Sequence, residues 1–325
     1  MRKLIRLLMI GIIIFGIPSG VLSADENYKI GVLVPKTGYL TQYGQLQMEG
    51  YGLAETEMAN LHWPVDVRYF DIGSQQKSLE DVFTGDVLPW KPDIIVGPYS
   101  SESSKKIASL LKGKPIPLIL PSASLDELTM RGNLNVFRVA LPAQFSAKSL
   151  GMYIKEQGEA GQIKTVGIFV EESVFGKAAA ESLKVQFKKL TLSIPQVVSY
   201  EFNDFNEKLR QVEVSPNDLT IVISRNVRHC IQITKTLQEK TKVIGFLSGF
   251  LTPSFREFAL EQKAQVFVYS PWLIDETDVI TSQFVDRFIN KYRTAFSSSF
   301  PQYHNAQAYT SLMIAGKTLD IHAKH

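Results

Sequence analysis

Short apolar runs alternate with longer amphipathic segments along nearly the whole chain, and this alternation constrains the fold more than any other feature. The runs are rich in Val and Ile and end at Gly, Pro or Ser, which is typical of buried parallel strands. Strands are predicted at Lys29–Val34, Val65–Phe70, Ile94–Val96, Pro117–Leu120, Val136–Ala140, Thr165–Val170, Val197–Tyr200, Leu219–Ser224, Val243–Phe246 and Val266–Tyr269. Helices are predicted at Gln45–Asn60, Ser78–Val87, Lys105–Lys112, Gln144–Gly158, Phe175–Leu190, Glu207–Val212, Val227–Glu239, Pro253–Leu260, Thr281–Phe296 and Asn305–Asp320. Such alternation predicts parallel sheets with helices on both faces, and two series of strands predict two α/β lobes.

The first 24 residues are predicted to be a secretory signal peptide. Arg2 and Lys3 give them a basic start, Leu4–Ile17 is an apolar core, and Ser23 and Ala24 supply small residues for cleavage. The apolar run is shorter than the ~20 residues that span a bilayer, and no later run is long enough to do so. We therefore expect a periplasmic protein that does not insert into the membrane after signal cleavage.

Charge and cysteine content exclude further classes of protein. The formal net charge is only +3, and Lys and Arg are scattered along the chain, so nucleic-acid binding is not supported. Cys230 is the only cysteine, which rules out an internal disulfide. Its apolar neighbours Val227 and Ile231 favour a buried thiol over a nucleophile.

Known catalytic motifs are missing from the sequence. It contains no G-x-S-x-G elbow, no G-x-x-x-x-G-K-[ST] phosphate loop and no G-x-G-x-x-G fingerprint. His229 and His304 are isolated, and His322 and His325 have no third metal ligand nearby. The sequence thus predicts no enzyme, no cofactor and no metal site.

The segment Asp93–Ser104, DIIVGPYSSESS, is the strongest candidate for a binding site. A buried strand ends at Gly97-Pro98, and serines follow where the next helix begins. Helix N-termini present unpaired N–H groups and the positive end of a dipole, so this turn suits a carboxylate or another anionic group. The alternative is that Ser101 or Ser103 is merely an N-cap residue.

Two further loops carry similar side chains at the ends of neighbouring strands. KTGYLTQYG follows the first strand with Tyr39, Thr41 and Tyr43, and PSASLDEL follows the fourth with Ser122 and Ser124. Each alone is an ordinary turn. In an open parallel sheet, however, ligands bind beyond the carboxyl ends of the strands, where these loops would meet.

Five segments together resemble a known family. IGVLVPKTGYLTQYGQ, DIIVGPYSSESS, PLILPSASLDELTMRGN, VFRVALPAQ and TVGIFVEESVFGKA follow each other with the order and spacing of the type I periplasmic substrate-binding proteins, and are most similar to the branched-chain amino-acid (Leu/Ile/Val)-binding subfamily of ABC transporters. The resemblance covers Lys29 to about Asp320.

This resemblance implies two Rossmann-like lobes with parallel sheets, joined by crossing segments and closing on a small ligand. It implies that residues 25–141 and 271–325 form lobe 1 and residues 142–270 form lobe 2. The crossings are expected near Ala140–Pro142 and Ser270–Leu273. Relatives usually continue beyond the last helix with more strands and a third crossing, so a smaller second lobe or a simplified hinge is expected here.

The resemblance also assigns roles to residues of the first lobe. Tyr43 matches the aromatic residue that forms one wall of the family pocket. Ser101, with Ser100 beside it, matches the serine region that binds the carboxylate of the ligand.

The second loop and the second lobe supply further matches. Ser122, Ala123 and Ser124 match the loop that holds the carboxylate and amino groups of the ligand through backbone and hydroxyl groups. Phe175 matches an aromatic residue of the second lobe that is usually a tyrosine, and a phenyl ring has no hydroxyl to donate.

The sequence departs from the family pattern at the expected ammonium contact. Amino-acid binders of the family place an acidic residue after a second-lobe strand, whereas the loop here, GFLSGF, has Leu247 and Ser248. Glu171 or Glu172 could substitute, but exposed loop acids are the simpler interpretation. Arg225 would instead favour an anionic ligand, its alternative being an ordinary surface arginine. Since a buried ammonium without a counter-charge is costly, this departure argues against an α-amino acid.

We therefore predict a periplasmic solute-binding protein. It would capture a small organic ligand, an amino acid or a carboxylate-like molecule, in the cleft between the lobes and deliver it to an ABC permease. Phe175, Arg225 and Leu247 would complete the pocket from the second lobe. The alternative is a ligand-sensing or scaffold protein of the same fold that acts on a receptor kinase or another membrane partner.

Overall fold

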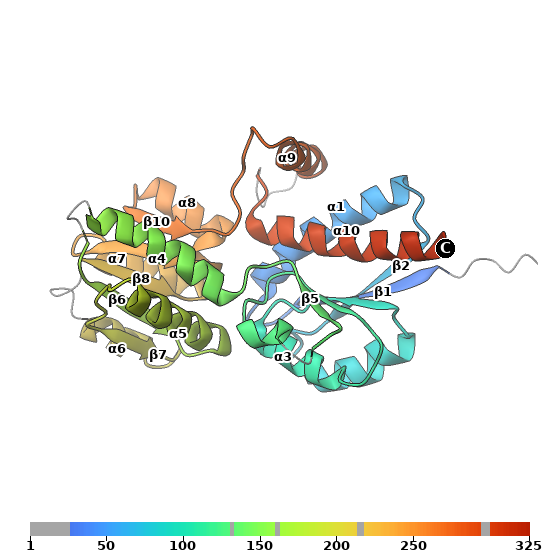
Figure 1. The fold of residues 1–325 in the computed structure, drawn as a ribbon, viewed down its shortest axis with the longest axis horizontal. Coiled ribbons are helices and arrows are strands. Elements are labelled where there is room, and N and C mark those ends of the chain that lie inside the picture. Colours follow the sequence, from blue (N-terminus) through green and yellow to red (C-terminus); the bar gives the residue numbers. More distant parts are fainter. Residues whose placement is uncertain (1–26, 131–132, 160–162, 213–217, 294–299) are drawn as a thin grey trace, which may run out of the picture.

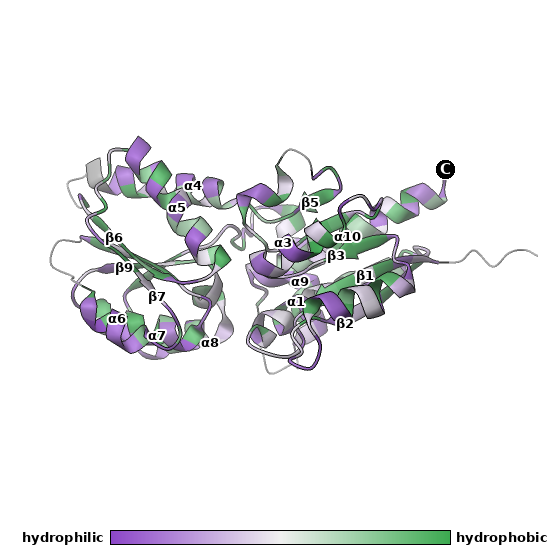
Figure 2. Ribbon diagram, turned by 90° about the horizontal axis from the view of Figure 1, so that it is seen from below, coloured by the Kyte–Doolittle hydropathy of each residue, from purple (hydrophilic) through white to green (hydrophobic). Residues whose placement is uncertain are grey.

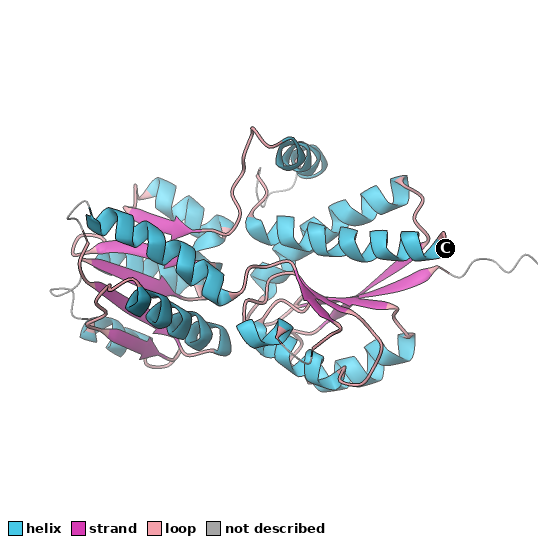
Figure 3. Ribbon diagram, viewed as in Figure 1, coloured by secondary structure: helices cyan, strands magenta, loops and turns pink. Residues whose placement is uncertain are grey.

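The computed structural model describes residues 27–130, 133–159, 163–212, 218–293 and 300–325. The predicted signal peptide lies outside the described residues, as does the predicted end of one helix at Phe296. The chain forms two α/β lobes that lie side by side along the longest axis of the molecule (Figure 1). This confirms the predicted fold class, two parallel sheets with helices packed on both faces (Figure 3).

The first lobe is built on a five-stranded parallel sheet. Its strand order is β2-β1-β3-β4-β5. In register, Ile30 of β1 pairs with Ile94 of β3, and Val32 with Val96, so their branched side chains lie on one face of the sheet and share one apolar core. The strands are β1 (Tyr28–Val34), β2 (Val65–Asp71), β3 (Ile94–Val96), β4 (Leu118–Leu120) and β5 (Val136–Arg138).

Helices from both ends of the chain cover this sheet. Those of the first lobe are α1 (Thr41–Asn60), α2 (Leu79–Val82), α3 (Ser101–Leu110), α9 (Val279–Tyr292) and α10 (Tyr303–Ala323). Helices α1 and α10 lie side by side (Figure 1) and share one apolar core with the sheet. Gly50 permits their close approach, because a Cβ there would lie 2.2 Å from the carbonyl oxygen of Asn305. The last helix is thereby held against the same sheet as the first.

The second lobe repeats this plan. Its strands are β6 (Val166–Glu171), β7 (Val197–Tyr200), β8 (Leu219–Ile223), β9 (Lys242–Phe246) and β10 (Val266–Tyr269), all parallel in the order β10-β9-β8-β6-β7. Its helices are α4 (Ala143–Glu159), α5 (Val174–Lys189), α6 (Phe205–Gln211), α7 (Val227–Leu237) and α8 (Pro253–Glu261). Separate apolar clusters fill its two faces, and the helices turn polar residues outward (Figure 2).

Helix boundaries differ from the prediction where capping or composition was misjudged. The segment predicted as one helix over Ser78–Val87 consists of α2, a π-helical turn (Phe83–Val87) and a 3-10 turn (Leu88–Trp90). Gly85 and Pro89 explain the irregularity, since glycine disfavours helix and proline lacks an N–H donor. Helix α3 begins at Ser101 instead of Lys105, because Ser100 caps it and the serines occupy its first turn.

None of the helices in the described parts of the chain combines the length and the apolar composition that crossing a membrane requires.

Candidate ligand-binding site

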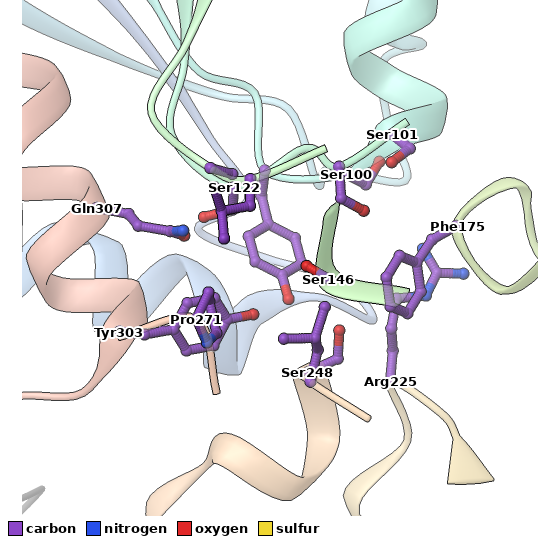
Figure 4. Close-up of a pocket in the computed structure, with 15 residues that line it drawn as sticks. Ser100, Ser101, Ser122, Ser146, Phe175, Arg225, Ser248, Pro271, Tyr303 and Gln307 are labelled. Atoms are coloured by element: carbon purple, nitrogen blue, oxygen red, sulfur yellow. The ribbon is translucent and has the colours of Figure 1, made fainter. Parts of the chain in front are cut away.

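A cavity lies where the two lobes face each other. The space between its atoms, which is partly open to solvent, amounts to about 460 Å3. The first lobe contributes Tyr99, Ser100, Ser101, Ser122 and Ser124 (Figure 4). These residues follow strands β3 and β4 at their carboxyl ends, where a parallel sheet places its ligands.

The second lobe and the C-terminal helix close the remaining sides. Phe175 follows β6, Arg225 follows β8, and Leu247 and Ser248 follow β9. Helix α10 adds Tyr303 and Gln307 from the first lobe (Figure 4). Residues predicted from loops far apart in the sequence therefore line one space. Tyr99, Ser248, Tyr303 and Gln307 were not predicted.

The turn before α3 aims its serines at the cavity. Gly97 has φ +95° and a Cβ there would lie 2.2 Å from the Leu33 carbonyl oxygen, so only glycine fits. The hydroxyl of Ser100 accepts a hydrogen bond from the Ser103 amide at 3.1 Å. The N-cap is thus Ser100, and the alternative that Ser101 or Ser103 is merely an N-cap residue was wrong. The amides of Ser101 and Glu102 have no acceptor within the helix, which leaves them for an anionic group.

In the loop after β4, some residues line the cavity and one packs into the core. Ser122 and Ser124 line the cavity. The methyl group of Ala123 is buried in the apolar core beneath the loop, and its carbonyl oxygen accepts a hydrogen bond from Arg138 at 3.5 Å. The structure therefore places Ala123 behind the cavity wall.

Tyr43 lies one layer behind the expected wall. Its ring is fully buried and stacks on Tyr99 with centroids 4.6 Å apart and an interplanar angle of 10°. Tyr99, in the PYSS motif, is the aromatic ring that lines the cavity. The hydroxyl of Tyr43 donates to the backbone carbonyl oxygen of Arg225 at 2.6 Å, which ties the first lobe to the second.

Hydroxyl groups from both lobes meet at the cavity. Ser248 of the second lobe is hydrogen-bonded to Tyr99 and Tyr303 of the first. Burial raises the pKa of both tyrosines above their ordinary value, so they are neutral at physiological pH. Burial also lowers the pKa of His304, whose ring packs against Tyr43, Tyr99 and Tyr303, to about 3.

Arg225 is bound between two carboxylates, one from each lobe. Its Nη2 lies 2.9 Å from Oε1 of Glu171, and its Nη1 lies 3.1 Å from Oε2 of Glu102 on α3. The Glu171 carboxylate also accepts from the Arg225 amide at 2.7 Å. Burial alone would lower the pKa of Arg225, but the attraction of both glutamates outweighs it and raises that pKa.

The exposed position expected for Glu171 and the surface alternative given for Arg225 were both wrong. Glu171 is not an exposed loop acid, since its side chain is only 12% exposed and pairs with Arg225. Arg225 is not a surface residue, and its charge is already matched. Glu172 agrees better with expectation, because it pairs with the exposed Lys177 at 2.7 Å.

Leu247 and Ser248 adopt backbone conformations that side chains rarely favour. Their φ angles are 62° and 46°, in the left-handed region. Both residues are buried and line the cavity, and Leu247 also packs into the core of the second lobe. Strain of this kind is found at ligand clamps, where the surrounding packing enforces it.

The cavity is therefore nearly uncharged, with hydroxyl groups set among apolar side chains. Within the described ranges, its wall includes no carboxylate side chain, and Arg225 is its one ionised group. Nor do the described residues bring together three or more His, Cys, Asp or Glu side chains that could hold a metal ion.

Comparison with known proteins points to one family. A sequence profile described as periplasmic binding protein matches residues 27–321. The chain is 23% identical over 198 residues to a leucine-, isoleucine-, valine-, threonine- and alanine-binding protein from Pseudomonas aeruginosa. This match covers 58% of the chain and about half, 52%, of the length of that relative.

Solved structures share the fold. A leucine-binding protein LivK from Thermotoga maritima has a TM-score of 0.77 at 19% identity, with 90% of this chain and 83% of that one covered. The LivJ protein of Streptococcus pneumoniae in complex with isoleucine has a TM-score of 0.76 at 22% identity, with 90% and 83% covered. A solute-binding protein from R. palustris in complex with 4-hydroxybenzoate has a TM-score of 0.78 at 15% identity, with 92% and 82% covered.

Removing the charge of Glu171 is expected to destabilise the protein. Glu171→Gln keeps the shape of the side chain but leaves the buried Arg225 with one carboxylate, so the free energy of unfolding should fall by roughly 3 kcal/mol. Urea unfolding followed by circular dichroism measures this change. Glu172→Gln, at the next residue, is the matched control and should cost less than about 1 kcal/mol, because its partner Lys177 is exposed. Equal losses in the two variants would contradict the role given to Glu171.

Buried His304 is expected to make the protein less stable in mild acid. The unfolded chain binds a proton at His304 below about pH 6.5, whereas the folded protein binds it only below about pH 3. The free energy of unfolding should therefore fall as pH drops below 6.5, with His304 contributing about 2 kcal/mol of loss at pH 5.

Urea unfolding at pH 8 and pH 5 measures this loss of stability. In a His304→Gln variant, the difference in the free energy of unfolding between the two pH values should shrink by the His304 contribution. His62→Asn, at an exposed histidine, should keep it. A His304→Gln variant with an unchanged difference between the two pH values would show that another group is responsible.

Proposed function

The chain belongs to the periplasmic binding protein family, and we propose that it captures a small organic acid between its two lobes and delivers it to the permease of an ABC transporter. The family is periplasmic and consists of binding proteins, not enzymes. Export through the signal peptide at residues 1–24 is part of this proposal.

One observation carries the proposal: the cavity offers hydrogen-bond donors suited to a carboxylate. Ser101, Ser122 and Ser124 line it, and α3, whose first-turn amides have no acceptor within the helix, begins at Ser101. These groups bind an anion without a fixed positive charge, because the helix dipole and the donors together stabilise it. Ser101 and the α3 amides would hold one oxygen, and Ser122 and Ser124 the other.

The same cavity is poorly suited to the ammonium group of an α-amino acid. Glu171 and Glu102 are the nearest candidates for its counter-charge, and both are paired with Arg225. Burying an ammonium without an anionic partner costs several kcal/mol. Solved structures of this fold hold isoleucine in one case and benzoate or 4-hydroxybenzoate in others. For this chain we therefore propose acids that lack the α-amino group.

Closure of the lobes would couple binding to transport. We place lobe 1 in residues 25–141 and 271–325 and lobe 2 in residues 142–270, with hinges near Ala140–Pro142 and Ser270–Leu273. A ligand shifts the balance between open and closed forms only by binding one form more tightly. In the closed form the ligand would contact both lobes, Phe175 and Leu247 of the second and the serines of the first. These added contacts would make the affinity of the closed form higher than that of the open form. The sensing or scaffold alternative is not favoured, since the solved structures named above include transporter binding proteins.

Thermal unfolding of residues 25–325, refolded to remove carried-over ligand, tests the proposal. Acids are compared with their α-amino counterparts: 4-methylpentanoate with leucine, and 3-phenylpropanoate with phenylalanine. An acid at about a hundred times its Kd should increase the free energy of unfolding by roughly 2.7 kcal/mol and raise the midpoint of thermal unfolding by several degrees. The amino acids should shift it less. A larger shift with the amino acids would contradict the ligand class, and no shift with any acid would contradict the function.

Two variants show whether the serine turn is involved. Ser101→Ala should weaken binding of the best acid several-fold, because one hydrogen bond to a charged group is lost. Ser109→Ala, on an exposed face of the same helix, is the matched control and should leave the affinity unchanged.

A further inference from the structure

Gln307 presents to the cavity an amide oxygen that accepts no hydrogen bond. It lies on α10 one turn after Tyr303, so both side chains project from the same face of that helix. Its side chain points toward the cavity near Ser122 (Figure 4). The residue is only 7% exposed, yet no described residue donates a hydrogen bond to its Oε1 atom.

A second glutamine lies behind the same part of the wall. Gln47 of α1 is fully buried, and its Oε1 also lacks a donor among the residues that the structure describes. Its Nε2 donates to the hydroxyl of Ser122 at 3.5 Å. Ser122 lines the cavity, so this bond helps to orient its hydroxyl beside Gln307. Three neutral polar groups thus come from α1, the loop after β4, and α10.

Unpaired polar atoms of this kind rarely remain buried in folded proteins, because leaving one unsatisfied costs more than a hydrogen bond gains. An amide oxygen that faces a ligand cavity is satisfied when the ligand brings a donor. An ammonium group would need a negative charge there, and neither glutamine nor serine has one. A neutral hydroxyl or carboxamide fits, since each donates to an amide oxygen and accepts from an amide or hydroxyl donor.

We propose that Gln307, with Gln47 behind the same part of the wall, binds a neutral hydroxyl or carboxamide at the end of the ligand opposite its carboxylate. Ser100 and Ser101 lie on one side of the cavity and Gln307 on the other, with Ser122 between them (Figure 4). The ligand is then a small acid with a second, uncharged hydrogen-bonding group. This inference rests on the proposed function, because it takes the serine turn as the site of the carboxylate.

Calorimetric titration of the refolded protein with matched acids tests this assignment. Each pair replaces the hydroxyl with a methyl group of similar size: 4-hydroxybenzoate against 4-methylbenzoate, and 5-hydroxypentanoate against hexanoate. In at least one pair the hydroxyl acid should bind about tenfold more tightly, because only it satisfies the Gln307 oxygen. Gln307→Met should reduce this preference to within about twofold by removing the amide at nearly constant volume. Gln45→Met, the same change on an exposed face of α1, should retain it.

The outcomes separate this inference from the proposed function. If acids bind but the methyl member of every pair binds as tightly as the hydroxyl member, the assignment of Gln307 is wrong and the function stands. The assignment is also wrong if Gln307→Met keeps the preference, as it would if a buried water satisfied the amide. If no acid binds to the folded protein, the function itself fails. The pairs measured on the wild-type protein decide the question even if Gln307→Met does not fold.

Discussion

The arrangement of the two lobes depends on the ion pairs of Arg225. Its guanidinium lies between Glu171 of the second lobe and Glu102 of the first, and its backbone carbonyl accepts from Tyr43. Glu102 in turn accepts from the Val174 amide at the start of α5, at 3.0 Å. Desolvation offsets much of the stabilisation that a buried ion pair provides, so we infer that these contacts chiefly fix how the lobes meet.

The same ion pairs determine the electrostatics of the cavity. Both glutamates are paired with Arg225, so neither is available to an ammonium group. The positive charge of Arg225 is balanced by the same two carboxylates, so it attracts an anion only weakly. Under the proposed function, specificity would then depend on hydroxyl, amide and backbone N–H groups. Such groups discriminate strongly when they are buried, since a ligand that fails to pair with them leaves them unsatisfied. The surrounding packing holds two of the lining residues, Leu247 and Ser248, in rare backbone conformations.

The sequence predicted correctly those features that depend on neighbouring residues, namely the strands and the loops that follow them. The β-branched runs fixed the strands, and loops at the carboxyl ends of β3 and β4 placed Ser100, Ser101, Ser122 and Ser124 at the cavity. Residues whose role depends on a distant partner were misread. Glu171 looked like a loop acid because its partner Arg225 is 54 residues away.

Other residues of the site carried little or no signal in the sequence. Tyr43 and Tyr99 are both aromatic residues in suitable loops, and only the three-dimensional structure shows that Tyr99 lines the cavity while Tyr43 stacks behind it. Gln307 lies within a long helix and gives no local sign of a binding role, although its contribution follows from the packing of α10 beside α1.

A crystal structure with the acid that most raises the unfolding midpoint would test the central claim most directly. The account predicts the carboxylate against the first-turn amides of α3 and the hydroxyls of Ser101 and Ser122, with the Arg225–Glu171 pair intact. A carboxylate bound to Arg225 with Glu171 displaced, or a ligand bound outside the cavity between the lobes, would contradict it.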